Sequence, residues 1–362
     1  MKSFFLTGLL VLVCGVISAQ ENPKNEELIT GQMVGFTQPS DSVFFFGGQL
    51  ASKYFKGNTL AAEVKEGNYR LRKHFNEPMM YRMVLLSDRN QLIWRAGRYF
   101  IDRSTTNIRT DLSNNDQVTI NGMVNTEYEH EFIPFIFAKK TGSKYTSDEV
   151  EKFEGSKETG FDSLLHTYVQ LHPSSYVALW ELVNRFMRFG HSITRQEILN
   201  LFSKEIKSGY IWNTLNDDFK NILIKEQKVF PSIKVQNTEY TTQSLIIPKA
   251  KFTLVDFWFS RCKPCLESYP GLKKIFDKYR EKGFNIVSIS TDKSSEKALW
   301  EKRIKEYGLN WLHYLDENGE ESKKLLIRNF PTTILLDSKG RVIKRDFDNL
   351  QLEKFLEKQL GK

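Results

Sequence analysis

The last third of the chain alternates apolar runs of strand length with longer stretches of helical period. Glycines end the two longest helical stretches, at Gly283 and Gly308, as is common at helix C-termini. The elements predicted, in chain order, are strand 253–259, helix 263–282, strand 284–290, helix 296–307, strand 311–315, a helical turn at 323–328, a hairpin turning at 338–340 and helix 350–360. This alternation predicts an α/β domain over residues 229–362, with a mixed sheet covered on both faces.

The first part of the chain has the pattern of β structure. Short runs rich in aromatic and β-branched residues, such as "DSVFFFGGQL" and "QVTINGM", are separated by Gly, Asn and Asp. We therefore predict an antiparallel β domain over residues 20–124. The run from Phe44 to Phe46 is interpreted as part of a buried strand rather than as a partner-binding edge.

A helical period follows over residues 125–228. The stretch "HPSSYVALWELVNRFMRFG" places apolar residues, among them Trp180 and Val183, on one helix face. The stretch "TRQEILNLFSKEIKSG" opens with Thr194 and Glu197 in the spacing of a capping box. No cluster of carboxylates or histidines suggests a site here, so we interpret this region as a spacer or scaffold.

The N-terminus reads as a secretory signal. "MKSFFLTGLLVLVCGVISAQ" combines Lys2, an apolar core and small residues before Gln20. Its apolar core is shorter than the roughly 20 residues that span a membrane. We predict a signal peptide over residues 1–19, removed together with Cys14, and export to the periplasm. A retained signal would instead leave the protein tethered to the membrane.

Composition and charge exclude some classes of function. With 40% apolar residues in a chain of 362, the protein is long enough for several packed units. The 52 lysines and arginines exceed 44 acidic residues, but the two kinds are interspersed along the chain. An exported protein also has little access to nucleic acid. We expect a solvated basic surface, with no nucleic-acid partner and no stable membrane insertion.

Two cysteines remain after signal removal, within "TLVDFWFSRCKPCLESYP". A disulfide that closes so short a loop gains little stability, so Cys262 and Cys265 are expected to serve chemistry. Cys262 would begin a helix, whose N-terminus, with Arg261 and Lys263 alongside, lowers a thiol pKa from its usual value of about 8.5. Cys262 is therefore predicted to be the nucleophile. Cys265, one turn further, would resolve the mixed disulfide.

Asp256 lies in the middle of the apolar strand before these cysteines. Its neighbours Val255 and Phe257 favour burial on both sides, which would raise the pKa of the carboxyl group. We predict that Asp256 accepts the proton of Cys265 during resolution. The alternative is that Asp256 faces solvent on an edge strand.

Other meanings of the C-x-x-C spacing fit less well. Haem attachment requires a histidine where Leu266 stands, and a zinc site requires more ligands than the lone downstream His313. A peroxidatic cysteine usually has a threonine where Phe259 stands. Dithiol redox chemistry remains, in which the Cys262–Cys265 pair is the redox-active group and no metal or bound cofactor is expected.

Residues 229–362 resemble the thioredoxin-fold domain of exported TlpA/ResA-like thiol-disulfide oxidoreductases. "LVDFW" followed by "CKPC" is similar to the family pattern. The resemblance implies that Asp256 is the family's buried acid, Cys262 its nucleophile and Cys265 its resolving cysteine. Pro270 matches the proline that kinks the active-site helix. The fold class is thus a multidomain chain: an antiparallel β domain, an α-helical region and a C-terminal α/β thioredoxin fold.

"IRNFPTTILLDSKG" resembles the loop that carries the family's cis-proline. The resemblance implies that Pro331 faces the cysteines and, with Phe330, binds substrate. A cis bond leaves the flanking backbone free to pair with an extended substrate and places no N–H near the sulfurs. A trans turn at the start of a strand is the alternative for Pro331.

The sequence departs from the family at two positions. Arg261 stands where tryptophan is common, and Ser268 stands where many members have a glutamate that tunes the thiols. Glu267 would point about 100° away around the helix, so that role is not transferred to it. We assign tuning of the thiols to Arg261, Lys263 and Pro264.

The function predicted is an exported oxidoreductase that reduces disulfides of substrate proteins through its CKPC dithiol, recharged by an upstream thiol electron donor. A disulfide oxidant or isomerase of the same fold is the first alternative. A non-catalytic module, in which the β domain captures a partner, is the second.

Overall fold

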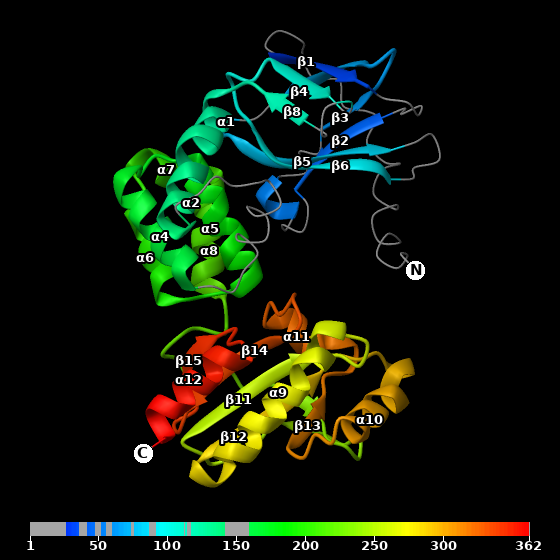
Figure 1. The fold of residues 1–362 in the computed structure, drawn as a ribbon, viewed down its shortest axis with the longest axis vertical. Coiled ribbons are helices and arrows are strands. Elements are labelled where there is room, and N and C mark those ends of the chain that lie inside the picture. The colour runs from blue at the N-terminus through cyan, green and yellow to red at the C-terminus, as the bar shows by residue number, and fades with distance from the viewer. Residues whose placement is uncertain are drawn as a thin grey trace.

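The computed structural model describes residues 27–35, 42–47, 52–55, 60–73, 76–86, 92–111, 113, 117–141 and 159–361. The predicted signal peptide, with Cys14, lies outside the described residues. Figure 1 shows a pair of β-sheets, a helical region and a third sheet with its own helices, in that order along the chain. Within the described ranges, no helix is both long and apolar enough to cross a membrane.

The N-terminal part consists of two four-stranded sheets. The first, in the order β4-β1-β7-β8, contains β1 (Glu27–Val34), β4 (Asn68–Lys73), β7 (Asn107–Asp111) and β8 (Gln117–Ile120). The second, in the order β3-β2-β5-β6, contains β2 (Ser42–Phe46), β3 (Leu60–Glu63), β5 (Met79–Leu86) and β6 (Leu92–Ile101).

The prediction of a purely antiparallel domain is wrong at one pair of strands. β1 and β7 run parallel, with Thr30 opposite Asn107. Parallel neighbours need a long connection, and here the whole second sheet is inserted between the two strands. The buried-strand interpretation of the Phe44 to Phe46 run holds in part: β2 lies between β3 and β5 and Phe45 is fully buried, but Phe44 and Phe46 are partly exposed.

The helical region packs directly against the second sheet. Its helices are α1 (Met123–Glu127), α2 (Ile133–Thr141), α4 (Thr159–Leu171), α5 (Tyr176–Phe189), α6 (Ile193–Leu201), α7 (Lys204–Ser208) and α8 (Tyr210–Asn221). Helix α5 is buried on nearly every side, not on one face as its pattern suggested. It lies among the other helices and the sheet: the Trp180 indole donates to the carbonyl of Pro78 at 2.8 Å and packs on Phe55.

One hydrophobic core runs through the two sheets and the helices, from Ile29 to Ile222. The Lys53 ammonium pairs with Asp218 of α8, and a buried ion pair joins Arg98 of β6 to Glu181 of α5. The helical region is therefore part of the same packed unit as the β-sheets rather than a separate spacer.

The predicted capping box at Thr194 is wrong. Ser192 is the N-cap of α6, and its hydroxyl accepts a hydrogen bond from the Arg195 N–H at 3.1 Å. The predicted single helix also breaks at Phe202, since Ser203 caps a separate helix, α7. Both serines offer the short side-chain oxygen that a helix N-terminus needs, and the sequence pattern alone did not rank them above Thr194.

The C-terminal part is built on a seven-stranded sheet in the order β10-β9-β13-β12-β11-β14-β15. Its elements are β9 (Lys234–Gln236), β10 (Thr242–Ser244), β11 (Phe252–Trp258), α9 (Lys263–Tyr279), β12 (Phe284–Ser290), α10 (Lys297–Glu306), β13 (Leu312–Leu315), α11 (Glu320–Lys324), β14 (Thr332–Asp337), β15 (Val342–Arg345) and α12 (Asn349–Leu360). β11 pairs parallel with β12 and antiparallel with β14, so the predicted mixed sheet is present.

Helix α11 lies earlier than the turn predicted at 323–328. The Asp316 carboxylate accepts the N–H groups of Glu321 and Ser322 at 2.9 and 2.7 Å, which fixes the start of the helix. Leu326, with a positive φ of 57°, lies just beyond its end.

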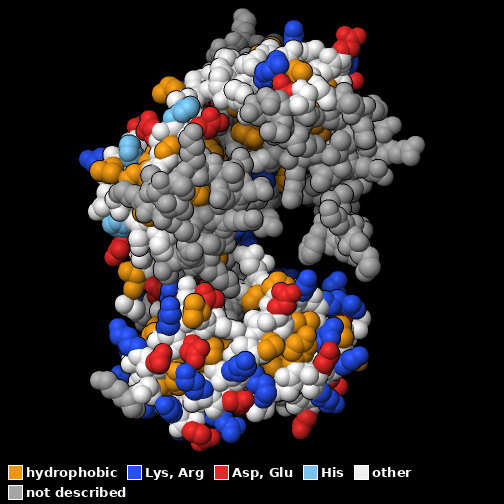
Figure 2. Space-filling model, viewed as in Figure 1, with side chains coloured by type: hydrophobic (Ala, Val, Ile, Leu, Met, Phe, Trp, Pro, Cys, Tyr) orange, Lys and Arg blue, Asp and Glu red, His pale blue; other side chains and the backbone are white. Residues whose placement is uncertain are grey.

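Figure 2 shows Lys and Arg interspersed with Asp and Glu over the C-terminal part of the molecule, without a single-sign field.

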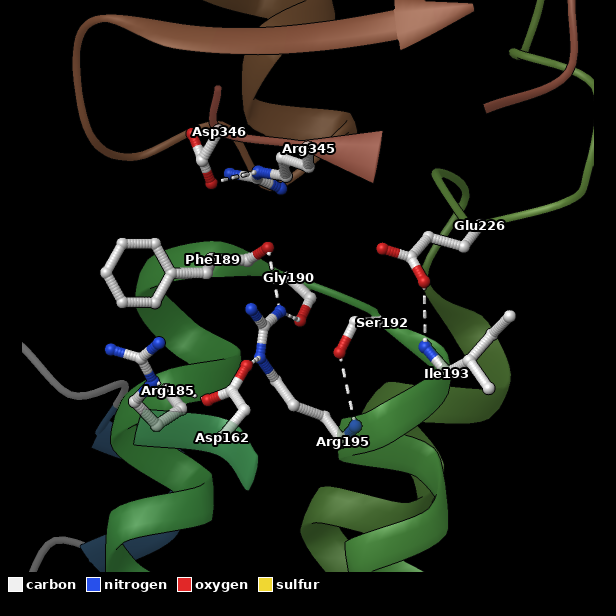
Figure 3. Close-up of polar contacts among 10 residues, drawn as sticks. All are labelled: Asp162, Arg185, Phe189, Gly190, Ser192, Ile193, Arg195, Glu226, Arg345 and Asp346. Atoms are coloured by element: carbon white, nitrogen blue, oxygen red, sulfur yellow. Dashed lines mark hydrogen bonds and ion pairs between the residues drawn. The ribbon is translucent and has the colours of Figure 1, made fainter. Parts of the chain in front are cut away.

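The C-terminal end of α5 meets the C-terminal part of the chain (Figure 3). The Arg195 guanidinium donates to the carbonyls of Phe189 and Gly190 at 3.1 and 2.6 Å, and Arg345 of β15 lies against Gly190. Close by, the Asn329 amide donates to the carbonyl of Arg188 at 3.1 Å. Polar groups thus occupy the junction between the two packed units.

Candidate active site

The two cysteines of the CKPC sequence lie where β11 passes into α9 and are joined as a disulfide. Their sulfurs are 2.01 Å apart. Cys262 is the N-cap of α9, and its Sγ accepts a hydrogen bond from the backbone N–H of Cys265 at 3.2 Å. Cys265 is completely buried, whereas Cys262 keeps a small exposure. Cys262 therefore offers the more accessible sulfur, at the positive end of the helix dipole, where a thiolate is stabilised.

The local sequence explains why the helix begins there. Pro264 lies in the first turn of α9, where a backbone N–H has no intrahelical partner and its loss costs little. The Cys262 N–H donates to the carbonyl of Phe259 at 3.0 Å, which closes the loop before the helix. The helix continues through Pro270 to Tyr279.

Both cations that flank Cys262 have carboxylate partners. The exposed Arg261 side chain pairs with Glu296 at 2.6 Å, and Lys263 pairs with Glu267 one turn later at 3.7 Å. These carboxylates oppose the positive field at the cysteine. The flanking charges therefore stabilise a thiolate less than the sequence suggested. The helix N-terminus is the larger source of that stabilisation.

Asp256 is buried in β11, the strand between β12 and β14, and is 2% exposed. Side chains alternate along a strand. Leu254 and Trp258 belong to the hydrophobic cluster that contains both cysteines, whereas Val255 and Phe257 belong to the cluster on the other face. Asp256 therefore points to the face covered by α9, and an exposed edge position is excluded.

Hydrogen bonds from two elements hold the Asp256 carboxylate. Its Oδ2 accepts from the Tyr269 hydroxyl of α9 at 3.3 Å and from the Ser288 hydroxyl of β12 at 2.9 Å. The Trp311 indole in turn donates to Ser288 at 2.9 Å. Burial, and then the negative charge of Asp256, raise the pKa of Tyr269 well above its usual value, so Tyr269 remains a donor.

The two partners of Asp256, and Trp311 behind Ser288, were missed in the sequence analysis. Ser288 carries a signal, since it is a polar residue inside the apolar run "FNIVSIS", as Asp256 is inside its own strand. Tyr269 and Trp311 carry none, because buried aromatic residues usually serve packing.

The Phe330–Pro331 peptide bond is cis. β14 begins with Thr332, which pairs with Phe257, so Pro331 lies beside the end of β11 that leads to the cysteines. The Phe330 ring meets the Phe259 ring edge to face at 5.3 Å. The proline loop and the cysteine-bearing loop are therefore neighbours.

Neither Ser268 nor Glu267 is placed to tune the thiols as the glutamate of many family members does. The Ser268 hydroxyl donates to the carbonyl of Cys265 at 2.7 Å, and Glu267 is exposed and paired with Lys263.

Among the residues that the structure describes, no group of three or more His, Cys, Asp or Glu side chains could hold a metal ion.

Comparisons with known proteins identify the family. The family model described as "Thioredoxin-like" matches residues 250–342. Thiol-disulfide oxidoreductase ResA of Bacillus cereus is 30% identical over 161 residues, which cover 42% of this chain and 90% of that protein. The chain belongs to the ResA-like thiol-disulfide oxidoreductases. ResA of Bacillus thuringiensis is 29% identical over 148 residues, covering 39% of this chain and 84% of that protein.

Among solved structures, the thioredoxin domain of a thiol-disulfide oxidoreductase from Bacteroides vulgatus is 30% identical to this ResA-like chain. It aligns with a TM-score of 0.34, over 37% of this chain and 97% of the other. Of the three cysteines in this ResA-like oxidoreductase, two lie within the matched residues, Cys262 and Cys265. The thioredoxin-like domain acts through a redox-active cysteine pair of this kind.

Proposed function

We propose that this protein is an exported reductant of disulfides in substrate proteins, with Cys262 as the attacking sulfur. One arrangement carries the proposal: the Cys262 sulfur accepts an N–H at the N-terminus of α9, and the buried Asp256 lies beneath the same helix. Export, and location in the periplasm, rest on the signal pattern of residues 1–19.

In the first step, the Cys262 thiolate attacks one sulfur of a substrate disulfide. A bond forms between Cys262 and that sulfur, and the substrate S–S bond breaks. The second substrate sulfur leaves as a thiolate, which takes a proton from water. In the second step Cys265 passes its proton to Asp256 and attacks the Cys262 sulfur, which releases the first substrate sulfur as a thiolate.

The reaction transfers two electrons from the dithiol to the substrate and leaves the Cys262–Cys265 disulfide. An upstream thiol donor must then supply two electrons to restore the dithiol. No further cofactor enters this scheme.

The substrate chain is proposed to lie along the cis-proline loop. Pro331 has no N–H to compete with the sulfurs, and the backbone on either side of it is available to an extended peptide. Phe330 and Phe259 provide apolar contact next to the cysteines. Arg261, Lys263 and Pro264 are assigned to tuning of the thiols, and the carboxylates paired with the two cations weaken that tuning.

Two measurements test the proposal. Cys265→Ser should accumulate mixed disulfides with substrate proteins, whereas Cys262→Ser should form none, and turnover by Cys262→Ser would refute the assignment. The equilibrium reduction potential of the pair sets the direction: a value of about −250 mV or lower fits a reductant, and one above about −150 mV indicates an oxidant.

A further inference from the structure

Asp292 is a buried acid close to the cysteines that the proposed reaction does not use. It is 1% exposed and lies just after β12. Both of its carboxylate oxygens accept the backbone N–H of Ser260, at 3.1 and 2.9 Å. The Ser260 hydroxyl adds a bond at 2.7 Å and the Ser290 hydroxyl one at 2.5 Å. Ser260 and Ser290 are themselves fully buried.

Ser260 belongs to the short loop that joins β11 to α9, two residues before Cys262. A backbone hydrogen bond joins the start of this loop to the residue after β12: the Thr291 N–H donates to the carbonyl of Trp258, the last residue of β11, at 2.9 Å. Asp292 adds the side-chain anchor. The path from β11 to the nucleophile is therefore held by the Asp292 carboxylate together with a backbone hydrogen bond from the segment after β12.

We propose that Asp292 is a positioning residue that, through Ser260, keeps the Cys262 sulfur at the N-terminus of α9 in the reduced enzyme. In the oxidised enzyme the disulfide itself holds Cys262 against the first turn of the helix. In the dithiol that covalent link is absent, so the loop decides whether the sulfur stays at the helix terminus, where its thiolate is stabilised. The inference rests on the proposed function, in which the Cys262 thiolate attacks.

Position and charge act on Cys262 in opposite directions. Holding the sulfur at the helix N-terminus lowers the pKa of its thiol, whereas a nearby carboxylate, acting by charge alone, raises it. The charged group that acts on Asp292 is Glu296, which repels it, and Glu296 is itself paired with Arg261. The sign of the change in the Cys262 pKa when Asp292 is removed therefore separates the two effects.

The experiment uses the full-length reduced protein with Asp292→Ala, Asp292→Asn and, as a matched control, Asp316→Ala. Asp316 is buried in the same domain and is likewise bonded to the backbone, accepting the N–H groups of two residues at the start of α11. The rate of iodoacetamide alkylation of Cys262 is measured against pH, with the modified cysteine located by mass spectrometry. The free energy of unfolding is measured for each variant.

Asp292→Ala is expected to raise the Cys262 pKa by about one unit, which lowers the thiolate fraction, and the alkylation rate, about tenfold at pH values below the pKa. Asp292→Asn keeps one acceptor oxygen for Ser260 and should give a smaller rise. Asp316→Ala should lose stability and leave the thiol unchanged. If Asp292→Ala does not fold, Ser260→Ala removes only the hydroxyl bond and should move the pKa in the same direction by less.

A lower Cys262 pKa in Asp292→Ala or Ser260→Ala, or an unchanged pKa with a loss of stability like that of Asp316→Ala, would overturn the proposal. A different result tests the proposed function: if Cys265 is alkylated faster than Cys262 in the unmodified protein, the assigned roles of the two cysteines fail. The Asp292 inference is judged separately, by the shift at Cys262.

Discussion

The Tyr269 hydroxyl donates a hydrogen bond to Oδ2 of Asp256 across 3.3 Å, from helix α9 to the strand beneath it. Tyr269 is four residues after Cys265 and therefore on the same side of the helix. Ser288 reaches the same oxygen from β12 at 2.9 Å. The acid is thus fixed beneath the helix face that carries the buried cysteine, where the proposed reaction places a proton acceptor for that cysteine.

Asp256→Asn is expected to slow release of the mixed disulfide by about 100-fold, the scale of a lost general base, and to change its formation much less. The amide occupies the same space but accepts no proton from Cys265. Rapid quenching of the reaction with a labelled peptide disulfide separates the two steps. Tyr269→Phe is the matched control, because it removes one hydrogen bond and keeps the carboxylate. Equal slowing of both steps by Asp256→Asn would count against the proton-acceptor role.

Arg261→Ala should have a small effect on the attack by Cys262. The Arg261 side chain is 67% exposed and paired with Glu296, and exposed pairs contribute about 0–1 kcal/mol, so we expect a loss of less than about fivefold in rate. Glu296→Gln should increase the rate, because it leaves the cation unopposed, and added salt should weaken this gain. Alkylation of Cys262 at fixed pH and several salt concentrations measures both. Arg280→Ala, at the far end of the helix, is the control.

The elements around the cysteines were predictable because each has a local signal. β12 has the predicted bounds, and β11 is displaced by a single residue, since an apolar run of this length between turns has few alternatives. Pro264, in the first turn, likewise marks the start of helix α9, and Gly283 marks the end of the short 3-10 turn that continues it. Asp256 was recognised as a buried acid because charge is rare inside such a run.

The rest depends on contacts between distant segments. The surroundings of α5 include Pro78, which lies just before β5 and about 100 residues earlier in the chain, so the amphipathic pattern of α5 could not reveal burial on every side. Ser288 and Asp292 are recognisable afterwards as polar residues in and after an apolar strand. Their partners Trp311 and Ser260 are not, because nothing local distinguishes a buried hydrogen-bonding tryptophan or serine from one that only packs.

His313 should make the C-terminal domain less stable in mild acid. Burial lowers the pKa of His313 to about 4, compared with about 6.5 in the unfolded chain. Between these values the unfolded state binds more protons, so stability is present above about pH 6.5 and is lost as the pH falls towards 4, by up to about 3 kcal/mol.

The measurement is the urea midpoint at pH 7 and pH 5 for the unmodified protein and for His313→Phe. Burial also lowers the pKa of His191 to about 4, but His191 is present in both proteins. The difference between their pH responses therefore isolates His313. The variant should lose less stability than the parent between the two pH values. The same loss in both proteins would contradict the prediction.

Gly190→Ala should loosen the junction between the two packed units. Gly190 has a φ of +67°, and an added Cβ would lie 2.5 Å from Nη1 of the buried Arg345. Gly340 is the matched control: its φ is +71°, but no atom lies within 4 Å of its Cβ position. Both variants place a side chain at a positive φ, which costs about 1–3 kcal/mol, and at Gly190 the ψ of −152° lies in a region that essentially only glycine adopts. Gly190→Ala adds overpacking of about 1–3 kcal/mol.

Limited trypsin digestion reports on the junction directly, because Lys225 and Lys228 lie in the segment that connects α8 to the C-terminal sheet. Cleavage there should accelerate in Gly190→Ala and stay near the unmodified rate in Gly340→Ala. Because Asn329, next to the cis-proline loop, also bonds to the end of α5, slower reduction of a protein substrate should accompany faster cleavage. Equal digestion of the two variants would mean that the contact between Gly190 and Arg345 does not hold the units together.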